Sequence, residues 1–435
     1  MPEPVETPAA ALMRLTNGYQ VSQAIHVAAE LRLADFIGDE PVTADAIAPR
    51  VGAHAPSLYR LLRALSTVGI FRKTDDKRFV GSPMSDLLRT DHPRSMWGWP
   101  AFIGRPHQRE MWGDLLHSVR TGQDAPHHLW GVDVWQYRAD KPEEIAGMNA
   151  AMAAVSRTVA PAIVAVYDFS RFGRIVDVGG ANGALLVAIL TVSPRSSGIV
   201  FDLPPVVREA ASVIREAGLE GRCEAVGGSW DAVPAGGDAY VIKAVLVDTT
   251  DEEAATLLRN VRSAMGPRGT LLVIDRLIGT PNEGAADAFI DITMLVGTGG
   301  AVRRQNEWAA VFAAGGFKLD SVTPTASRFY VLEGHPSESP VLRSAQCSTE
   351  ASNFTLKRTP ARIRSPRPLS VGVRQTESSA SPRGKQWSSR HQRTARRSLS
   401  SGVDRVNRSC SSTGQLAARR AGPWLPRFWP SSSPS

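Results

Sequence analysis

Extended apolar runs alternate with helical runs from about residue 172 onwards, and this alternation restricts the fold more than any other feature of the chain. The extended runs are RIVDVGG, GIVFDLP, RCEAVGG, DAYVIKAVL and TLLVIDRL, and helical runs such as ALLVAILTVS separate most of them. Strands joined through helices pair in parallel and need helices on both faces of the sheet. We therefore predict an α/β fold with a doubly wound, mostly parallel sheet over residues 171–335. Two last runs, GFKLDSVTP and SRFYVLEG, are too close for a helical crossover and predict an antiparallel edge hairpin.

Residues 10–91 combine short helices with two short extended pieces. The run SLYRLLRALSTVG places Leu58, Leu62 and Leu65 on one helical face and stops at Gly69. TADAIAPRVG and VSQAIHVAAELRLADFIGD indicate two more helices, while IFRKT and KRFVGS indicate a hairpin. Three helices and a hairpin are typical of a winged helix. Because the first of these helical runs carries only two arginines among its leucines, we favour packing and dimerisation over DNA binding.

Residues 92–170 indicate a helical connector rich in aromatic and histidine side chains. Aromatic walls with a few polar groups are typical of pockets for flat ligands, but rings can equally fill the space between two domains. A metal site on the adjacent His127 and His128 is not expected, because neighbouring histidines on a helix point apart and no cluster of Cys, Asp or Glu completes the set. The rings in question are Trp97, Trp99, Phe102, Trp112, Trp130, Trp135 and Tyr137, with His92, His107 and His117 among them.

The last hundred residues, 336–435, differ in composition from the rest of the chain. They hold 18 of the 50 Lys and Arg against four acids, together with 22 serines. The other 335 residues therefore carry 32 basic and 38 acidic side chains, which excludes a basic footprint over the whole fold. Since the tail cannot bury enough apolar surface to fold, we predict a disordered basic Ser/Arg-rich segment. It is either a nucleic-acid-binding arm or unselected sequence, such as out-of-frame translation joined near His335, and we favour the second.

Cysteine usage and hydropathy indicate the cellular compartment. Residues 1–335 contain one cysteine, Cys223, and no apolar run of transmembrane length. The start, MPEPVETPAA, lacks the basic and apolar regions of a signal peptide. We therefore expect a cytoplasmic protein that does not bind a membrane.

The turn DVGGANG, residues 177–183, follows the first predicted strand. Gly179 and Gly183 let the backbone approach a ligand and turn tightly into a helix, while Asp177 puts a carboxylate at the strand tip. Asp202 ends the second strand, nineteen residues after Gly183, where it can accept both hydroxyls of a ribose. NAD and S-adenosylmethionine both fit these residues. The acid beside the turn would repel a pyrophosphate and suits the amino and sulfonium groups of S-adenosylmethionine.

The order of the motifs resembles a known family. DVGGANGALL, FDLPPVV, CEAVGGSW, DAYVIKAVLVDTTDEEA, LLVIDRL, DITMLVGTGG and AAGGFKL are similar to segments of S-adenosylmethionine-dependent small-molecule O-methyltransferases, such as the caffeic acid, acetylserotonin and hydroxyneurosporene enzymes. The resemblance spans residues 12–334. It implies a Rossmann-like methyltransferase sheet with an N-terminal winged-helix dimerisation domain, a homodimer, and S-adenosylmethionine as cofactor. It also implies a methyl acceptor that is a hydroxylated small aromatic or polyketide-like molecule.

The same resemblance assigns roles to residues. It implies that the glycine turn holds the methionine part of the cofactor, that Asp202 holds the ribose, and that Ser229 and Trp230 lie beside the adenine. Ala181 replaces a glycine of the family's turn, and Ser229 replaces an Asp whose loss removes a hydrogen bond worth about 1 kcal/mol. Met148, Met152 and Met294 match residues that grip flat substrates, although Met at helical spacing is more often core. The implied cofactor set is Asp177, Gly179, Gly180, Gly183, Asp202, Leu203, Ser229, Trp230 and Lys243.

The chain departs from the family at the catalytic stretch. The family reads K-H-x-L-H-D-W-x-D-E with the second His as general base, whereas this chain reads KAVLVDTTDE with Val247 at that position. Asp275 and Val302 stand where the family has two Glu residues that steady the His. Valine accepts no proton, and assistance by a base contributes about 10²–10⁴-fold in rate. The base is therefore unknown; Asp248 is a weak candidate, or it simply orders the turn beside a capping box of Thr250 and Glu253.

Three functions fit these observations. We favour a methyltransferase whose acceptor ionises by itself, or whose base is Asp248, His107, His117 or His127. The second is a cofactor-binding homologue with a different or lost activity, such as hydroxylation. The third is a regulator in which the winged helix binds DNA and the sheet senses a metabolite. No metal is expected in any of them.

Overall fold

The computed structural model describes residues 6–337, except residues 75, 280–281 and 283. The tail beyond Ser337, with its predicted disorder and its possible role as a nucleic-acid arm, lies outside the described residues. Within those residues, none of the helices has the length and apolar character needed to span a membrane.

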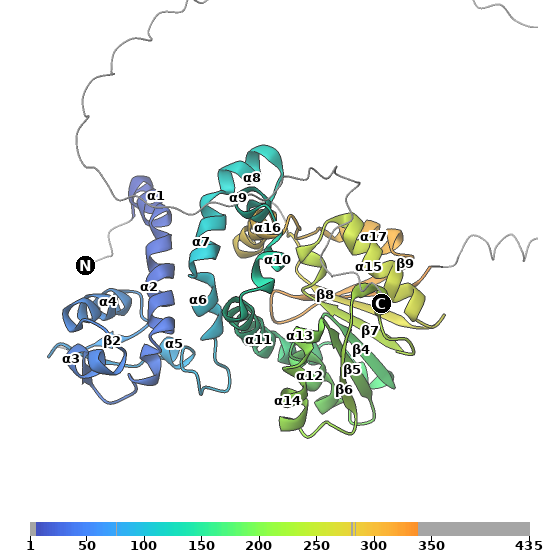
Figure 1. Ribbon diagram of the computed structural model, residues 1–435, viewed down its shortest axis with the longest axis horizontal. Coiled ribbons are helices and arrows are strands. Elements are labelled where there is room, and N and C mark those ends of the chain that lie inside the picture. The colour runs from blue at the N-terminus through green and yellow to red at the C-terminus, as the bar shows by residue number, and fades with distance from the viewer. Residues whose placement is uncertain (1–5, 75, 280–281, 283, 338–435) are drawn as a thin grey trace, which may run out of the picture. The chain divides into compact units, whose positions relative to one another are not determined.

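The N-terminal part contains short helices and a small antiparallel sheet with strand order β1-β3-β2 (Figure 1). Helix α2 stops before Arg32, whose φ of +50° breaks the helical path, and a 3-10 turn follows. Gly69, with φ +79°, follows Val68, the residue that caps the end of α4, so the helix stops at this glycine as predicted. The elements are α1 (Pro8–Thr16), α2 (Gly18–Glu30), β1 (Val42–Thr43), α3 (Ala44–Ile47), α4 (Ala55–Thr67), β2 (Arg72–Lys73), β3 (Arg78–Val80) and α5 (Pro83–Asp86).

Six helices connect this part to the large sheet. Asp124 and Asp133 begin two of them, because each aspartate side chain accepts hydrogen bonds from backbone N–H groups of the first turn. Proline stands in the first turn of α7, α9 and α11, where its missing N–H is not needed. The helices are α6 (Gly98–Ile103), α7 (Pro106–Gly113), α8 (Leu115–Thr121), α9 (Ala125–Trp130), α10 (Val134–Ala139) and α11 (Pro142–Val164).

A seven-stranded sheet with order β6-β5-β4-β7-β8-β10-β9 forms the second part. The first five strands in this order are parallel, and β10 pairs antiparallel with both β8 and β9, which confirms the predicted edge hairpin. The chain order reverses between β4 and β7, the point at which open α/β sheets bind ligands. The strands are β4 (Arg174–Val178), β5 (Ser197–Asp202), β6 (Cys223–Gly227), β7 (Ala239–Lys243), β8 (Thr270–Asp275), β9 (Phe317–Pro324) and β10 (Tyr330–Pro336).

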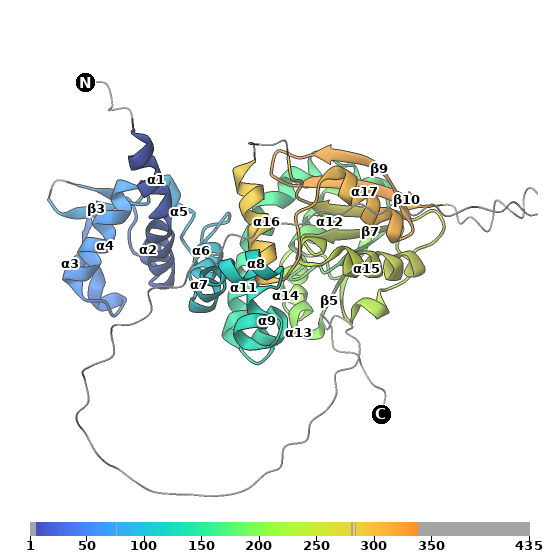
Figure 2. The same ribbon diagram turned by 90° about the horizontal axis from the view of Figure 1, so that it is seen from above.

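Helices cover both faces of this sheet, as its apolar strands require (Figures 1 and 2). Helices α11, α12 (Ala184–Val192) and α14 (Ala210–Glu216) bury their apolar sides against one face. Helices α15 (Asp251–Ala264) and α17 (Gln305–Ala314) cover the other. Helix α13 (Pro204–Val207) is separate from α14, with residues 208–209 between them. Helix α16 (Ala285–Gly297) instead contacts α7, α8 and α9.

Candidate functional site

The glycine turn after β4 has a backbone that only glycine accommodates at two points. Gly179 has φ +73°, and a Cβ on it would lie 2.5 Å from Cγ2 of Val245. Gly183 has φ +77°, and a Cβ there would lie 2.9 Å from Cγ2 of Val200. Gly183 also begins α12, so the turn leads directly into the N-terminus of that helix. Glycine is therefore required at these two points both by the left-handed backbone and by the close packing of Val245 and Val200.

Asp202 and the glycine turn meet at the tips of β4 and β5. The Oδ2 atom of Asp202 accepts a hydrogen bond from the backbone N of Ala181 at 2.8 Å, and Oδ1 accepts one from Leu203 at 2.7 Å. Burial raises the pKa of Asp202, and these two hydrogen bonds oppose the rise. The carboxylate is thereby fixed at the strand tip, beside the turn, as the sequence predicted.

Asp177 is a buried acid without hydrogen bonds. Neither of its carboxylate oxygens has a partner among the described residues, and the side chain is 1% exposed. Burial raises the pKa of Asp177 to about 7, and the nearby Lys243 at the end of β7 opposes this rise. Burial lowers the pKa of Lys243. An unsatisfied carboxylate under a glycine turn fits a ligand that brings amino groups or positive charge, which is the character of S-adenosylmethionine.

Ser229 and Trp230 follow β6, at the same edge of the sheet. The Ser229 hydroxyl hydrogen-bonds to the carboxylate of Asp231, and Trp230 begins a 3-10 turn and packs against the core. The backbone N of Gly228 donates to the carbonyl of Asp202 at 3.0 Å, which ties this loop to the tip of β5. The structure thus places every residue of the implied cofactor set at the carboxyl ends of β4, β5, β6 and β7 or in the turns that follow them.

The turn after β7 carries Val247 and Asp248 and is held from outside. Arg303, 1% exposed, donates to the carbonyls of Leu246 at 2.6 Å and Thr249 at 2.7 Å, and pairs with Asp251 at 2.7 Å. A Cβ on Gly300 would lie 2.2 Å from the carbonyl oxygen of Val247. The backbone at Gly300 therefore packs directly on the turn. Neither Arg303 nor Gly300 is predictable from the sequence as a contact of this turn, because the contacts reach across more than fifty positions.

Asp248 has the electrostatic character of a proton acceptor near neutral pH. Burial, and then the negative charge of Asp275, raise the pKa of Asp248 to about 7, while Arg138 opposes the rise. No described residue donates a hydrogen bond to this carboxylate. The Thr250–Glu253 capping box is present, with the Glu253 carboxylate on the backbone N of Thr250 at 2.8 Å. The helix start is therefore capped without help from Asp248.

Asp275, at the end of β8, is a buried acid near enough to Asp248 for its charge to act on it. Its Oδ1 accepts from the backbone N of Arg276 at 2.8 Å, and Oδ2 has no hydrogen-bond partner in the described part of the chain. Burial raises the pKa of Asp275 to about 6, against the opposing charges of Arg303, Arg276 and Lys243. Two acids near one another in a buried place rarely ionise together at neutral pH.

Aromatic rings from α6 and α10 flank His107 of α7, and a ring from α9 stacks on one of them. The ring centroid of His107 lies 5.7 Å from that of Phe102 and 5.8 Å from that of Tyr137, and Tyr137 stacks on Trp130 at 3.8 Å. Burial lowers the pKa of His107 to about 4, although Glu144 at 3.2 Å favours its charged form. A neutral imidazole with so low a pKa is a weak base, so His107 is less suited than Asp248 to take a proton.

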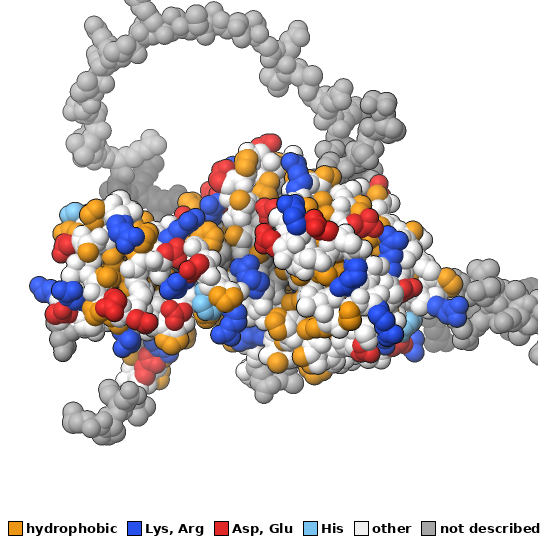
Figure 3. Space-filling model, turned by 90° about the horizontal axis from the view of Figure 1, so that it is seen from below, with side chains coloured by type: hydrophobic (Ala, Val, Ile, Leu, Met, Phe, Trp, Pro, Cys, Tyr) orange, Lys and Arg blue, Asp and Glu red, His pale blue; other side chains and the backbone are white. Residues whose placement is uncertain are grey.

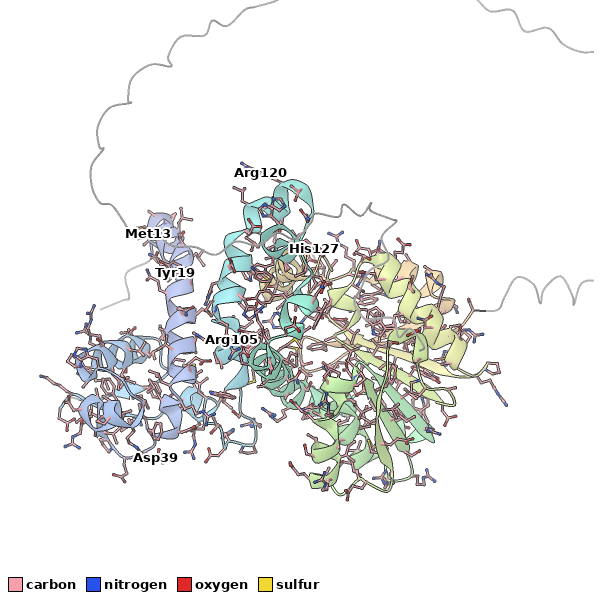
Figure 4. All side chains as sticks on the ribbon, viewed as in Figure 1. Met13, Tyr19, Asp39, Arg105, Arg120 and His127 are labelled. Atoms are coloured by element: carbon pink, nitrogen blue, oxygen red, sulfur yellow. The ribbon has the colours of Figure 1, made fainter. Side chains whose placement is uncertain are left out.

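His117 and His127 lie on the small helices α8 and α9, and Figure 4 labels His127 there. The His117 ring stacks on that of His128 at 3.6 Å and bonds to Gln123, while Nδ1 of His127 lies 2.7 Å from Asp124. Each of these partners lies within residues 114–128, so the histidines serve the local packing of these helices.

The three methionines predicted to line the pocket are half-buried. Met148 lies on α11, and its sulfur accepts a hydrogen bond from Nη1 of Arg138 at 3.3 Å. Met152 lies one turn further along α11, and Met294 lies on α16. Figures 1 and 2 both place α16 beside the helices α8 and α9, which it contacts.

Comparison with known proteins gives two family matches. The sequence profile of an O-methyltransferase dimerisation domain matches residues 13–91, and that of an O-methyltransferase domain matches residues 112–318. The chain is 38% identical over 326 residues to the phenazine O-methyltransferase PhzM of Lysobacter antibioticus, covering 75% of this chain and 95% of that protein.

Two further relatives bear on the chemistry. A crystal structure of an O-methyltransferase from neocarzinostatin biosynthesis, solved with S-adenosylmethionine and 2-hydroxy-5-methyl naphthoic acid, is 34% identical with a TM-score of 0.62. The match covers 73% of this chain and 96% of that one. The aclacinomycin 10-hydroxylase RdmB of Streptomyces purpurascens is 29% identical over 335 residues, covering 75% of this chain and 88% of that protein.

Proposed function

Since this chain belongs to the family of S-adenosylmethionine-dependent O-methyltransferases, we propose that it methylates a hydroxyl on a flat aromatic acceptor and that Asp248 takes up the proton. The cofactor is S-adenosylmethionine, and the acceptor is a small aromatic or polyketide-like molecule. The observation that carries the proposal is the contact between the glycine turn and Asp202, which joins two parts of a nucleoside site at adjacent strand tips.

The residues at the sheet edge fit the parts of the cofactor. We assign Asp202 to the ribose, the turn from Gly179 to Gly183 to the methionine part, and the loop with Ser229 and Trp230 to the adenine. The unsatisfied carboxylate of Asp177 supports this assignment, since a cofactor with an amino group supplies the donors that the chain does not. Lys243 is close enough to Asp177 for its positive charge to lower the pKa of that carboxylate.

The proton step falls to Asp248. When bound, S-adenosylmethionine supplies a methyl group on a positively charged sulfur, and the chain's task is to position an ionised oxygen for in-line attack. Asp248 with a pKa of about 7 is poised to accept the hydroxyl proton at neutral pH. Arg303 and Gly300 fix the turn that carries Asp248, which keeps its carboxylate in place.

Hydroxylation is a second candidate function, because Val247 stands where the family has its catalytic histidine. Similarity to the 10-hydroxylase RdmB supports it. Mass spectrometry of the product distinguishes the two functions. We expect an acceptor such as 2-hydroxy-5-methyl naphthoic acid, incubated with the full chain and S-adenosylmethionine, to gain one methyl group. With dioxygen and a thiol reductant also present, gain of one oxygen atom instead would identify a hydroxylase, and an unchanged acceptor would contradict both.

We assign dimerisation to residues 10–91, the acceptor chamber to the helices of residues 92–170, and the cofactor to residues 171–335. Helix α1 has no buried residue, and its apolar side chains Leu12 and Leu15 are 66% and 68% exposed. Met13 and Tyr19 are also exposed, and Figure 4 labels both on α1 and α2. An apolar face of this kind supports a homodimer formed with a second copy.

A DNA-binding regulator has less support. Acidic and basic side chains are interspersed over the face in Figure 3. Duplex DNA needs a continuous basic surface instead. Cys223 is a free, buried thiol, which supports the cytoplasm as the location that we propose.

A further inference from the structure

Arg138, on α10, is a buried guanidinium with unsatisfied hydrogen-bonding capacity. The residue is 7% exposed, and the guanidinium carbon lies 5.3 Å from the ring centroid of Phe102 and 5.6 Å from that of Trp135. One hydrogen bond is made, from Nη1 to the sulfur of Met148, a weak acceptor. The buried Nε has no partner among the described residues, and none of their carboxylates forms an ion pair with Arg138.

Arg303 is a buried arginine whose hydrogen bonds and ion pair are all supplied by the fold, and it serves as a comparison. Its guanidinium contacts two backbone carbonyls and the carboxylate of Asp251, all at 2.7 Å or less. Burying a charge without oxygen acceptors costs several kcal/mol, so such groups in proteins normally have a partner. The missing acceptors at Arg138 therefore point to a ligand.

The place of Arg138 identifies which ligand. Asp248 and Glu144 are near enough for their charges to raise the pKa of Arg138, which burial lowers to about 10. The guanidinium thus stays charged at neutral pH, and it lies against the rings of Phe102 and Trp135. A molecule held against these rings places its substituents beside Arg138.

We propose that Arg138 binds a carboxylate of the acceptor, so that the enzyme selects hydroxylated aromatic acids over their neutral counterparts. A planar guanidinium binds a carboxylate through two parallel N–H···O bonds, and such charge-assisted bonds are about twice as strong as neutral ones. The carboxylate of the substrate then supplies the hydrogen-bond acceptors that Arg138 lacks within the fold. This inference rests on the proposed function, because it names the substrate class of the same site.

Binding measurements on a matched pair of ligands test the inference. The pair is 2-hydroxy-5-methyl naphthoic acid and its carboxamide, which differ in charge and hardly in shape. We expect calorimetry on the full chain, saturated with S-adenosylhomocysteine, to give a Kd for the acid about tenfold or more below that for the amide. Arg138→Gln should remove this preference and leave the Kd of the amide within about twofold, while Arg138→Lys keeps part of it.

Several outcomes would overturn the inference. Equal affinities of the wild-type chain for acid and amide would do so, as would binding of neither, or an equal loss of both in Arg138→Gln, which is what a structural role predicts. If the Arg138→Gln variant does not fold, the affinities of the wild-type chain and of Arg138→Lys for the acid and the amide test the inference. Failure of S-adenosylhomocysteine to bind would contradict the proposed function instead. The two ligands are then titrated again without S-adenosylhomocysteine, which tests the role of Arg138 separately.

Discussion

Asp248 combines a half-buried position with a pKa of about 7 at a turn where the family's base is missing. Because only the ionised carboxylate accepts a proton, kcat should be low below this pKa and rise to a plateau above it. Asp248→Asn should lower kcat about 10²–10⁴-fold and remove the rise. The control is Glu252→Gln, an exposed acid of the same segment, which should keep the wild-type pH profile. A profile that Asp248→Asn leaves unchanged would show that the acceptor ionises without this residue.

Ala181 adopts φ +50°, a left-handed conformation that costs a residue with a Cβ about 1 kcal/mol. Its backbone N is the donor to Asp202, so the strained residue lies inside the cofactor site. Ala181→Gly should therefore raise the free energy of unfolding by about 1 kcal/mol, measured by chemical denaturation. A lower stability of the glycine variant would mean that the backbone of this turn is not strained.

At the scale of elements, the turn from Leu246 to Asp248 depends on a segment that follows α16. Gly300→Ala would drive a Cβ into the carbonyl of Val247 and should cost about 3 kcal/mol or displace the turn, with loss of activity. Gly297→Ala is the matched control, because nothing lies within 4 Å of its would-be Cβ in the helix. Thermal unfolding and kcat of the two variants should differ clearly. Equal behaviour would contradict the packing of residue 300 on the turn.

Elements with a strong local pattern were predictable from the sequence, and contacts between distant elements were not. The strands of the large sheet, the edge hairpin and the capping box at Thr250 follow from period, spacing and residue type. The clamp by Arg303 is different, because Arg303 is adjacent to another arginine and that pair gives no local sign of burial. Arg138 is hidden in the same way, since its neighbours come from separate helices. Side-chain burial of this kind is decided by tertiary packing.

For the whole molecule, the exposed apolar face of α1 and α2 predicts association. Leu15→Asp places a charge in that face and should shift the full chain from dimer to monomer in light scattering. Val192→Asp is a control, since Val192 is exposed to a similar degree at the end of α12 in the sheet domain. A monomeric wild-type chain, or a Leu15→Asp variant that stays dimeric, would contradict the assignment of residues 10–91 to dimerisation.

The whole arrangement of strands, turns and connector helices serves one cofactor site at the point where the chain order of the sheet reverses. Calorimetric titration of the full chain with S-adenosylhomocysteine tests this most directly. We predict measurable heat at micromolar concentrations and a Kd that Asp202→Ala raises about tenfold or more, while Glu224→Ala, exposed on the neighbouring strand β6, leaves it unchanged. No heat with the wild-type chain at high micromolar ligand, or equal affinities of both variants, would contradict the site at Asp202.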